Sequence, residues 1–311
     1  MKNIYFTLAF ALLFMMGATA QQDPHYTQYM YNMSVVNPAY AGSKENVSLG
    51  ALYRKQWVNI DGAPETATFF IHSPIGNNVG LGLSVISDKI GPVEENNVYA
   101  DFSYTLNLGG EHRLAFGLKA GATFQNIGLF SDIGNGFVVD AGDEAFSQNT
   151  SNTYLNIGSG FFYYTNKYYV AFSVPNMLKS THLNVTNSGQ EYQFGSEALH
   201  YFLTGGYVFD LSEHTKFKPS FMLKSAIEAP SSLDLSANVL LYDRFEIGAT
   251  YRTDDAFGGM VNFAITQDLR IGYAYDSVTS DLNPKTSASH EIMVLFDLNF
   301  PKKVSISPRF F

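Results

Sequence analysis

The sequence contains no cysteine, which excludes disulfides, thiolate metal sites and cysteine nucleophiles. It also lacks a long hydrophobic run: beyond residue 20, no stretch approaches the ~20 uninterrupted apolar residues of a membrane-spanning helix. Basic residues are few, with 19 Lys and Arg against 28 Asp and Glu. Because nucleic-acid binding requires a concentrated basic surface, we expect no nucleic-acid partner.

Residues 1–20 are predicted to be a secretory signal peptide. Lys2 supplies a positive start, residues 4–16 form an apolar core, and residues 18–20 (Ala-Thr-Ala) provide a small-residue cleavage site. The mature chain is therefore expected to begin at Gln21. Since an exported chain without a later helical span can enter a membrane only by β-strands, the strand pattern decides its class.

What the sequence has in abundance is period-two alternation of apolar and polar residues. Val98, Phe102 and Tyr104 share one face of a predicted strand, and Asp101 and Ser103 share the other. After a Gly-Gly turn the alternation resumes, so residues 97–124 are typical of a β-hairpin whose arms are about as long as tilted transmembrane strands. We predict fourteen strands, near residues 46–56, 65–73, 79–88, 97–108, 112–125, 152–164, 167–174, 198–210, 214–226, 232–242, 244–253, 257–267, 268–277 and 289–300.

Short and long connections alternate along these predicted strands. Tight links occur at Asn166 and Asp243, for example, whereas links of the other set are generally longer and reach residues 126–151 and 175–197. Transmembrane barrels have short periplasmic turns and long external loops, and a soluble β-sandwich has no reason to keep that alternation. We therefore predict an all-β fold: a transmembrane antiparallel β-barrel of about 14 strands over residues 46–300, with a short N-terminal helix, long extracellular loops and both termini periplasmic.

Two segments flank the predicted barrel. Residues 21–45 are expected to form a periplasmic or plug segment that begins with a helix start at Asp23-Pro24. Four apolar residues then follow the spacing of one helix face: Tyr26, Tyr29, Met30 and Met33. Packing against or inside the barrel and docking of a periplasmic partner both fit this stripe. Residues 301–311 are expected to be a C-terminal tail, because Pro308 argues against a central strand.

The predicted inner face carries charges of both signs: Arg54, Asp101, Lys119, Lys218, Lys224, Asp234, Arg270, Glu291 and Asp297. Interspersed signs favour a solvated or cross-paired lumen over a selectivity constriction. The sequence contains no zinc-binding HExxH, no nucleophile elbow and no glycine-rich phosphate loop, and its histidines are scattered. We predict no catalytic residue, no cofactor and no metal site.

The two longest predicted external loops, residues 126–151 and 175–197, are candidates for contact with a partner. Loops of this length are generally functional or disordered. Both mix turn-forming with apolar residues, and apolar residues carry most of the energy of a protein contact. The candidate partner-contact residues, which would contact cargo if the partner is a secreted protein, are therefore Phe137, Val138, Val139, Tyr192 and Phe194. The alternative is that these loops fold over the barrel mouth.

Several blocks of the sequence resemble the PorP/SprF family. In chain order they are Gln22-Asp23-Pro24 with Tyr26 and Gln28-Tyr29-Met30; Asn37-Pro38-Ala39-Tyr40-Ala41-Gly42; Tyr53-Arg54-Lys55-Gln56-Trp57 with Gly62-Ala63-Pro64; Gly80-Leu81-Gly82-Leu83-Ser84 with Asp88-Lys89-Ile90-Gly91; Phe116-Gly117-Leu118-Lys119-Ala120-Gly121; Ser289-His290-Glu291-Ile292-Met293; and Ser307-Pro308-Arg309-Phe310-Phe311. Together these blocks cover essentially the whole mature chain and are specific as an ordered set.

The resemblance implies a non-enzymatic outer-membrane component of the Bacteroidetes type IX secretion system. Members are associated with secretion or surface attachment of cargo proteins that bear a C-terminal sorting domain, including gliding adhesins. Some are linked to periplasmic partners that bind the peptidoglycan of the cell wall. The expected partners are therefore outer-membrane lipid, a secreted cargo protein and a peptidoglycan-binding protein. The alternatives are a diffusion channel or hydrophobic-substrate transporter, and an outer-membrane hydrolase.

Overall fold

The structure, a computed structural model, describes residues 25–44, 46–128, 150–178, 181–187, 190–196, 199–226, 229–280, 286 and 288–298. The predicted signal peptide, the cap at Asp23-Pro24 and the C-terminal tail lie outside these residues. The candidate contact residues Phe137, Val138 and Val139 also lie outside them.

One antiparallel sheet makes up most of the described chain. Its strands are β1 (Val47–Lys55), β2 (Glu65–Ile75), β3 (Val79–Ile90), β4 (Val93–Gly109), β5 (His112–Ile127), β6 (Thr150–Tyr164), β7 (Tyr168–Val174), β10 (His200–Tyr207), β11 (Phe209–Ser212), β12 (Thr215–Ala226), β13 (Ala229–Leu241), β14 (Phe245–Arg252), β15 (Ala256–Ala264), β16 (Leu269–Val278) and β17 (Ala288–Leu298). Since β10 and β11 both pair with β12, they occupy one position, broken at Val208. The predicted 14-stranded antiparallel barrel is confirmed.

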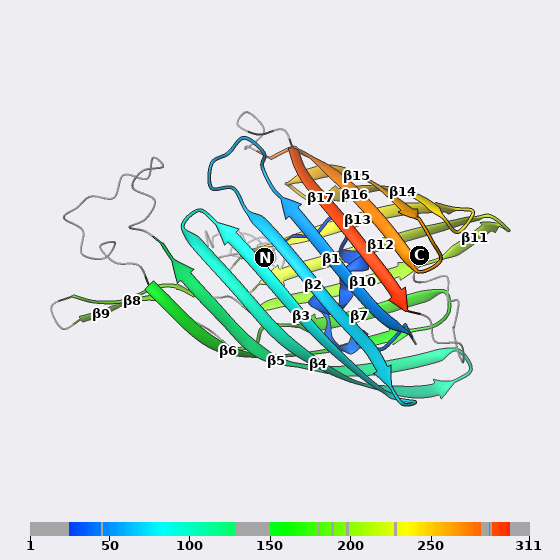
Figure 1. The fold of residues 1–311 in the computed structure, drawn as a ribbon, viewed down its shortest axis with the longest axis horizontal. Helices are drawn as coiled ribbons and strands as arrows, with labels where there is room; N and C mark the ends of the chain where they lie inside the picture. Colours follow the sequence, from blue (N-terminus) through cyan, green and yellow to red (C-terminus); the bar gives the residue numbers. More distant parts are fainter. Residues whose placement is uncertain are drawn as a thin grey trace, which may run out of the picture.

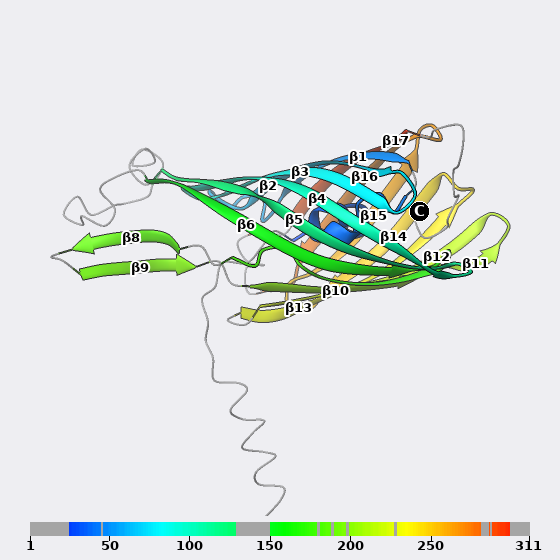
Figure 2. The ribbon, with the colours of Figure 1, turned by 90° about the horizontal axis from the view of Figure 1, so that it is seen from below.

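The sheet closes on itself, as Figure 1 and Figure 2 show. β1 pairs with β17 at nine register positions, from Val47↔Leu298 to Lys55↔His290. β10 pairs with β7 on one side and β12 on the other, which completes the circle. We call the end where β1 begins and β17 ends the near end, and the opposite end the far end. A separate hairpin, β8 (Thr181–Asn187) with β9 (Gln190–Ser196), projects at the far end (Figure 1).

The predicted alternation of faces is present in the barrel wall. In β4, Asp101 and Ser103 are buried in the interior, whereas Phe102 and Tyr104 are exposed on the outside. All nine charged residues of the predicted inner face are buried or half-buried. The period-two pattern therefore placed polar side chains in the lumen and apolar side chains toward lipid.

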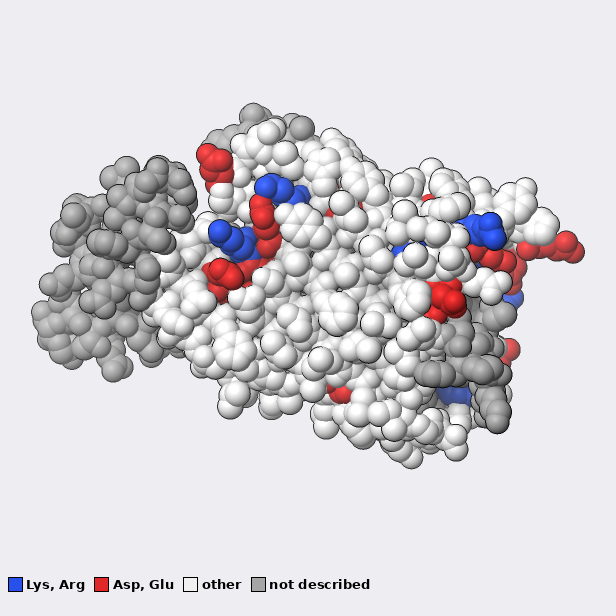
Figure 3. Space-filling view, in the orientation of Figure 1, with Lys and Arg blue, Asp and Glu red and all other residues white. Residues whose placement is uncertain are grey.

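Ion pairs mark the two ends of the apolar exterior. At the far end, Lys55 Nζ lies 2.5 Å from Glu65 Oε1. At the near end, Lys216 Nζ lies 2.5 Å from Asp243 Oδ1, and Lys167 is paired with Asp210. Most of the face between the two ends is uncharged (Figure 3). An apolar belt between charged rims is the surface expected to face bilayer hydrocarbon.

The prediction of a long external loop over residues 89–96 is wrong. β3 continues to Ile90 and β4 begins at Val93, so only Gly91-Pro92 separates them. The cross-strand pair Lys89↔Glu94 extends the hairpin into what charge and polarity had indicated as loop. No helix in the described ranges is long and apolar enough to cross a membrane.

The N-terminal segment before β1 lies inside the barrel, and it does not form one amphipathic helix. It forms a 3₁₀ turn η1 (Tyr29–Tyr31), a single α-turn α2 (Met33–Val36) and a second 3₁₀ turn η2 (Pro38–Tyr40). Every residue from Tyr26 to Ala41 is buried, so the segment has no solvent-exposed face. The prediction of one helix with a single apolar stripe from Tyr26 to Met33 is wrong. Enclosure by the wall on all sides removes the solvent that would favour a polar face. We call residues His25–Lys44 the plug.

Candidate functional site

The plug runs lengthwise through the barrel, from the far end to the near end. Thr27 contacts Asp276 and Glu291, which lie near the far ends of their strands. At the other extreme, Lys44 Nζ pairs with Asp297 at 3.2 Å, next to the near end of β17. The chain therefore enters the lumen at the far mouth and leaves it at the near mouth to form β1.

This path places the two ends of the described chain at opposite mouths of the barrel. An even strand count does put the start of β1 and the end of β17 at the same end of the barrel. The described chain nevertheless begins at His25 in the far mouth, because the segment before β1 crosses the lumen. The described residues end at Leu298, near the opposite mouth. The chain's own ends lie outside the described residues, so the expectation that both are periplasmic stays a prediction.

Charged residues of β1, β16 and β17 hold the far half of the plug, and we call Arg54, Asp276 and Glu291 the charged wall. The backbone N–H groups of Thr27 and Gln28 donate to the Glu291 carboxylate at 2.9 and 2.8 Å. Arg54 bonds Thr27 Oγ1 at 2.7 Å, and pairs with Asp276 at 2.7 Å and Glu291 at 3.2 Å. Each of these side chains is almost fully buried, so the contacts are made in a low-dielectric interior.

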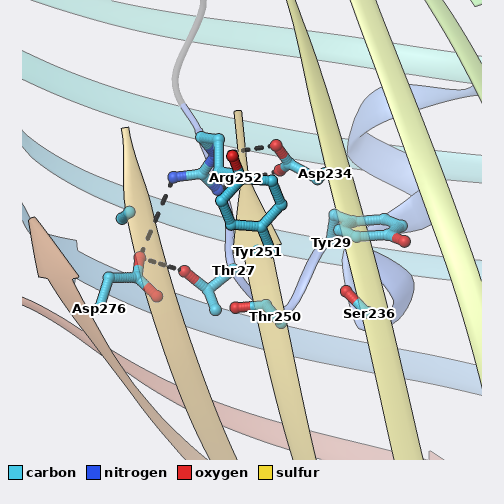
Figure 4. Close-up of a pocket in the computed structure, with 9 residues that line it drawn as sticks. Thr27, Tyr29, Asp234, Ser236, Thr250, Tyr251, Arg252 and Asp276 are labelled. Atoms are coloured by element: carbon cyan, nitrogen blue, oxygen red, sulfur yellow. Dashed lines mark hydrogen bonds and ion pairs between the residues drawn. The ribbon is translucent and has the colours of Figure 1, made fainter. Parts of the chain in front are cut away.

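Arg252 extends this network around the far mouth (Figure 4). Its guanidinium donates twice to Asp234, at 2.9 and 3.0 Å, in the fork geometry that suits a carboxylate. It also lies 4.0 Å from Asp276, which accepts a hydrogen bond from the Thr27 hydroxyl at 2.5 Å. The cavity among these groups is about 10 Å³, about the volume of one water molecule.

Two plug tyrosines reach polar residues deeper in the lumen. The Tyr31 hydroxyl donates to Glu246, which also pairs with Arg270 at 3.2 Å. The Tyr29 hydroxyl donates to Ser220 at 3.1 Å.

The near half of the plug packs against glycines on the opposite side of the lumen, and we call Gly80, Gly117 and Gly160 the glycine wall. A Cβ at Gly117 would lie 2.1 Å from the Ala39 nitrogen, and one at Gly80 would lie 2.1 Å from the Ala41 oxygen. A Cβ at Gly160 would lie 2.4 Å from the Asn37 amide oxygen. The Asn37–Gly42 turn therefore fits only because these strand positions carry no side chain.

Wall side chains also satisfy backbone carbonyls of this turn region. Lys119 Nζ donates to Val35 O at 3.0 Å and lies 3.4 Å from Asp101. Ser103 donates to Ala41 O at 2.6 Å. These bonds meet the requirement that buried backbone oxygens find donors, which short helical turns do not supply themselves.

The structure places the sequence-predicted site residues in three locations. Tyr26, Tyr29, Met30 and Met33 are buried in the plug. Tyr192 and Phe194 lie on β9, at the register positions Val185↔Tyr192 and Leu183↔Phe194. The three predicted contacts from Phe137 to Val139 lie outside the described residues. Sequence reasoning missed the glycine wall, although its residues stand at inward positions of β3, β5 and β6, where a missing side chain signals close approach.

The lumen offers little chemistry beyond holding the plug. Two cavities in the lumen, bordered by Thr27 and Arg252 or by Tyr40 and His72, measure about 10 Å³ each. Among the described residues, no three His, Asp or Glu side chains come together as metal ligands. The charged side chains described above are paired with one another or with the plug.

Comparisons with known proteins identify a family and a fold. Residues 18–296 match the family described as "Type IX secretion system membrane protein PorP/SprF". The structure is similar to the CymD monoaromatic hydrocarbon channel (TM-score 0.51, 12% identity, covering 88% of this chain and 93% of that one). It is also similar to the Ralstonia pickettii toluene transporter TbuX (TM-score 0.51, 9% identity, covering 91% and 96%). At such identities the likeness establishes the outer-membrane barrel fold alone. No curated protein sequence matches.

Proposed function

We propose that this chain, which belongs to the PorP/SprF family of type IX secretion system membrane proteins, supports secretion and surface anchoring of cargo proteins that carry a C-terminal sorting domain. In this role the barrel is non-enzymatic: it is a membrane-embedded holder. Its further partners would be outer-membrane lipid and a periplasmic peptidoglycan-binding protein.

The observation that carries a holding role is the filled lumen. The plug contacts both the charged wall and the glycine wall, and two cavities beside it admit about one water each. A diffusion channel or a hydrophobic-substrate transporter needs a continuous path through or out of the barrel. A plug bonded at both of its ends argues against that alternative.

The proposed orientation places the far end outside the cell and the near end in the periplasm. The near-end links are short: residues 76–78 join β2 to β3, and Gly110-Glu111 joins β4 to β5. The far end carries the longer connections and the β8–β9 hairpin. Short periplasmic and long external connections are the rule for bacterial outer-membrane barrels.

Two far-end features suit protein partners. The β8–β9 hairpin forms its own two-stranded sheet, and such hairpins are marginal without further packing. β6 extends beyond the end of β7, so Ser151, Thr153 and Leu155 pair only with β5 among the described strands. An open strand edge can accept an added strand from another protein.

The proposal is tested with a secreted fluorescent reporter fused to a C-terminal sorting domain. One variant replaces residues 129–149 by a tight turn, and a second deletes residues 179–198 with the β8–β9 hairpin. We expect normal barrel assembly but release of the reporter into the medium. A Gly-Ser insertion at the near-end turn Gly109-Gly110 is the control and should retain the reporter. Retention by both variants would place the contact elsewhere, in the lumen or in the shorter far-end connections.

Bilayer recording separates holding from transport. The purified barrel should show no steady single-channel conductance, whereas a variant without residues 25–44 should conduct, because the plug blocks the lumen. Steady conductance in the unaltered protein would favour the channel alternative.

A further inference from the structure

A groove of about 570 Å³ lies on the outer surface of the barrel over β7, β10 and β12. This volume is within the range of small-molecule binding sites. Its outward-facing residues are apolar or aromatic: Tyr168, Val170, Tyr207, Pro219, Phe221 and Leu235. The groove is therefore a hydrocarbon-lined depression in the surface that faces the bilayer.

Two neighbouring glycines and a proline create the depression. Gly205 points outward in β10 with no side chain, and a Cβ there would lie 2.7 Å from the Phe221 ring. Pairing of β10 with β12 stops at Gly206↔Ser220, and β11 resumes it at Phe209↔Phe217. Pro219, which has no N–H to donate, lies in that interval. The hydrogen-bonded ladder is therefore interrupted where the groove lies.

The lumen side of the same wall is filled. Behind Gly206 stands the buried Tyr169 ring, 2.8 Å from where a Cβ of Gly206 would lie. Beside it, Ser220 accepts a hydrogen bond from Tyr29 of the plug. The groove consequently opens toward the membrane and not into the barrel.

The groove reaches the near-end membrane interface. A row of aromatic rings runs beside it there, with Tyr168 and Tyr207 stacked at 6.0 Å between centroids and Phe209 4.4 Å beyond Tyr207. The Lys167–Asp210 ion pair follows at the end of the strands. Aromatic rings mark the level of lipid headgroups, so a chain in the groove would have its headgroup close to these residues.

We propose that the groove binds one acyl chain of a phospholipid from the near-end leaflet. Strands β7, β10 and β12 belong to the membrane wall, so the groove opens onto hydrocarbon, and a flexible chain can fill it and cover the interrupted ladder. The choice of phospholipid over lipopolysaccharide rests on the proposed orientation, in which the near-end leaflet is the periplasmic one.

Native mass spectrometry of the intact barrel, titrated with palmitoyl-oleoyl phosphatidylethanolamine in detergent, tests this. Gly205→Phe fills the groove, and Val170→Trp fills it from the neighbouring strand if the first variant assembles poorly. Gly259→Phe adds the same bulk on the lipid face of β15, where no atom other than Gly248 O lies within 4 Å of the new Cβ. Each buried methylene contributes roughly a fourfold factor in affinity, so losing two or more should weaken binding over about tenfold.

We expect one tightly retained phospholipid in the unaltered protein and in Gly259→Phe, and its loss in both groove variants. Equal retention in all four proteins would overturn the proposal, as would no retention in any. Retention of lipid A but not of phosphatidylethanolamine would overturn the assigned source. Loss of cargo anchoring with lipid binding intact would contradict only the proposed function.

Discussion

The two walls that hold the plug do so by different physics. The charged wall binds the far half through directional bonds between buried ions, hydroxyls and backbone N–H groups. The glycine wall binds the near half by shape, because the plug backbone occupies the space of missing side chains. Directional bonds fix the register of the plug along the barrel, whereas glycines fix only how closely it approaches. Each wall should therefore fail in its own way.

The largest effect is expected at the charged wall. Glu291→Ala removes the acceptor of two backbone N–H groups and leaves Arg54 buried with less countercharge, which should cost about 3–5 kcal/mol. The midpoint of guanidinium unfolding measures this, and conductance reports whether the plug is displaced. Glu291→Gln keeps the shape and one acceptor and should lose less. Equal midpoints for Glu291→Ala and the unaltered protein would show that the wall does not hold the plug.

Lys119 brings a charge to the glycine side and sharpens the contrast with the lipid face. From sequence alone, Phe116→Arg near the midplane should cost about 2–4 kcal/mol and Lys119→Ala far less. Because Lys119 pairs with Asp101 and donates a hydrogen bond to Val35 O, Lys119→Ala is expected to cost about as much as Phe116→Arg. Folded barrel recovered from membranes is the measure, and Lys119→Ala with Asp101→Asn should recover part of the loss.

A smaller but distinct effect is expected at the glycine wall. Gly117→Val places a side chain where the Ala39 backbone lies, and such overpacking costs about 1–3 kcal/mol. A cysteine introduced at Ala39 would be the only thiol, because the sequence has no other cysteine. Its labelling should become faster, because overpacking pushes the plug away from the wall. Gly259→Val, on the lipid face, is the control. Unchanged labelling after Gly117→Val would mean that the near half does not depend on shape.

The smallest effect concerns pH at the far mouth. Burial, and then Lys224, Arg252, Arg54 and His200, lower the pKa of His25 below its ordinary 6.5. The released segment then binds more protons than the docked one, so docking should weaken as pH falls through 6.5, by at most about 1.4 kcal/mol per pH unit. Thiol labelling of a cysteine introduced at the far mouth should become faster between neutral and mildly acidic pH. The variant His25→Gln should abolish this dependence on pH.

Much of the fold follows from local patterns in the sequence. Strict alternation in β4 and β5 identified both strands and their faces, because each face meets a different solvent. Boundaries at the far ends were less accessible: Glu94 and Asn96 are polar residues typical of a loop, yet they continue β4 above the membrane, where a strand needs no apolar face.

The plug was the least accessible part of the site. Tyr26 and Met33 follow helical spacing, but spacing assumes a solvent-exposed opposite side, which a lumen does not provide. The individual charges of the wall were visible in the sequence, and their pairing was not. Arg54, Asp276 and Glu291 are far apart in the chain and meet only because β1 closes against β17 and β16 follows.

The lengthwise path of the plug constrains the order of assembly. The strands of this barrel surround the segment that precedes them. Once the barrel is closed, the plug could enter the lumen only if the free N-terminal end of the chain were threaded through it. If the β1–β17 seam forms last, the strands instead wrap around a segment that was synthesised before any of them. The plug would then serve as the template that brings β1 and β17 into register, since Glu291 and Arg54 meet each other and Thr27 across that seam. The same residues that close the lumen would thereby also align the two strands of the seam as the barrel forms.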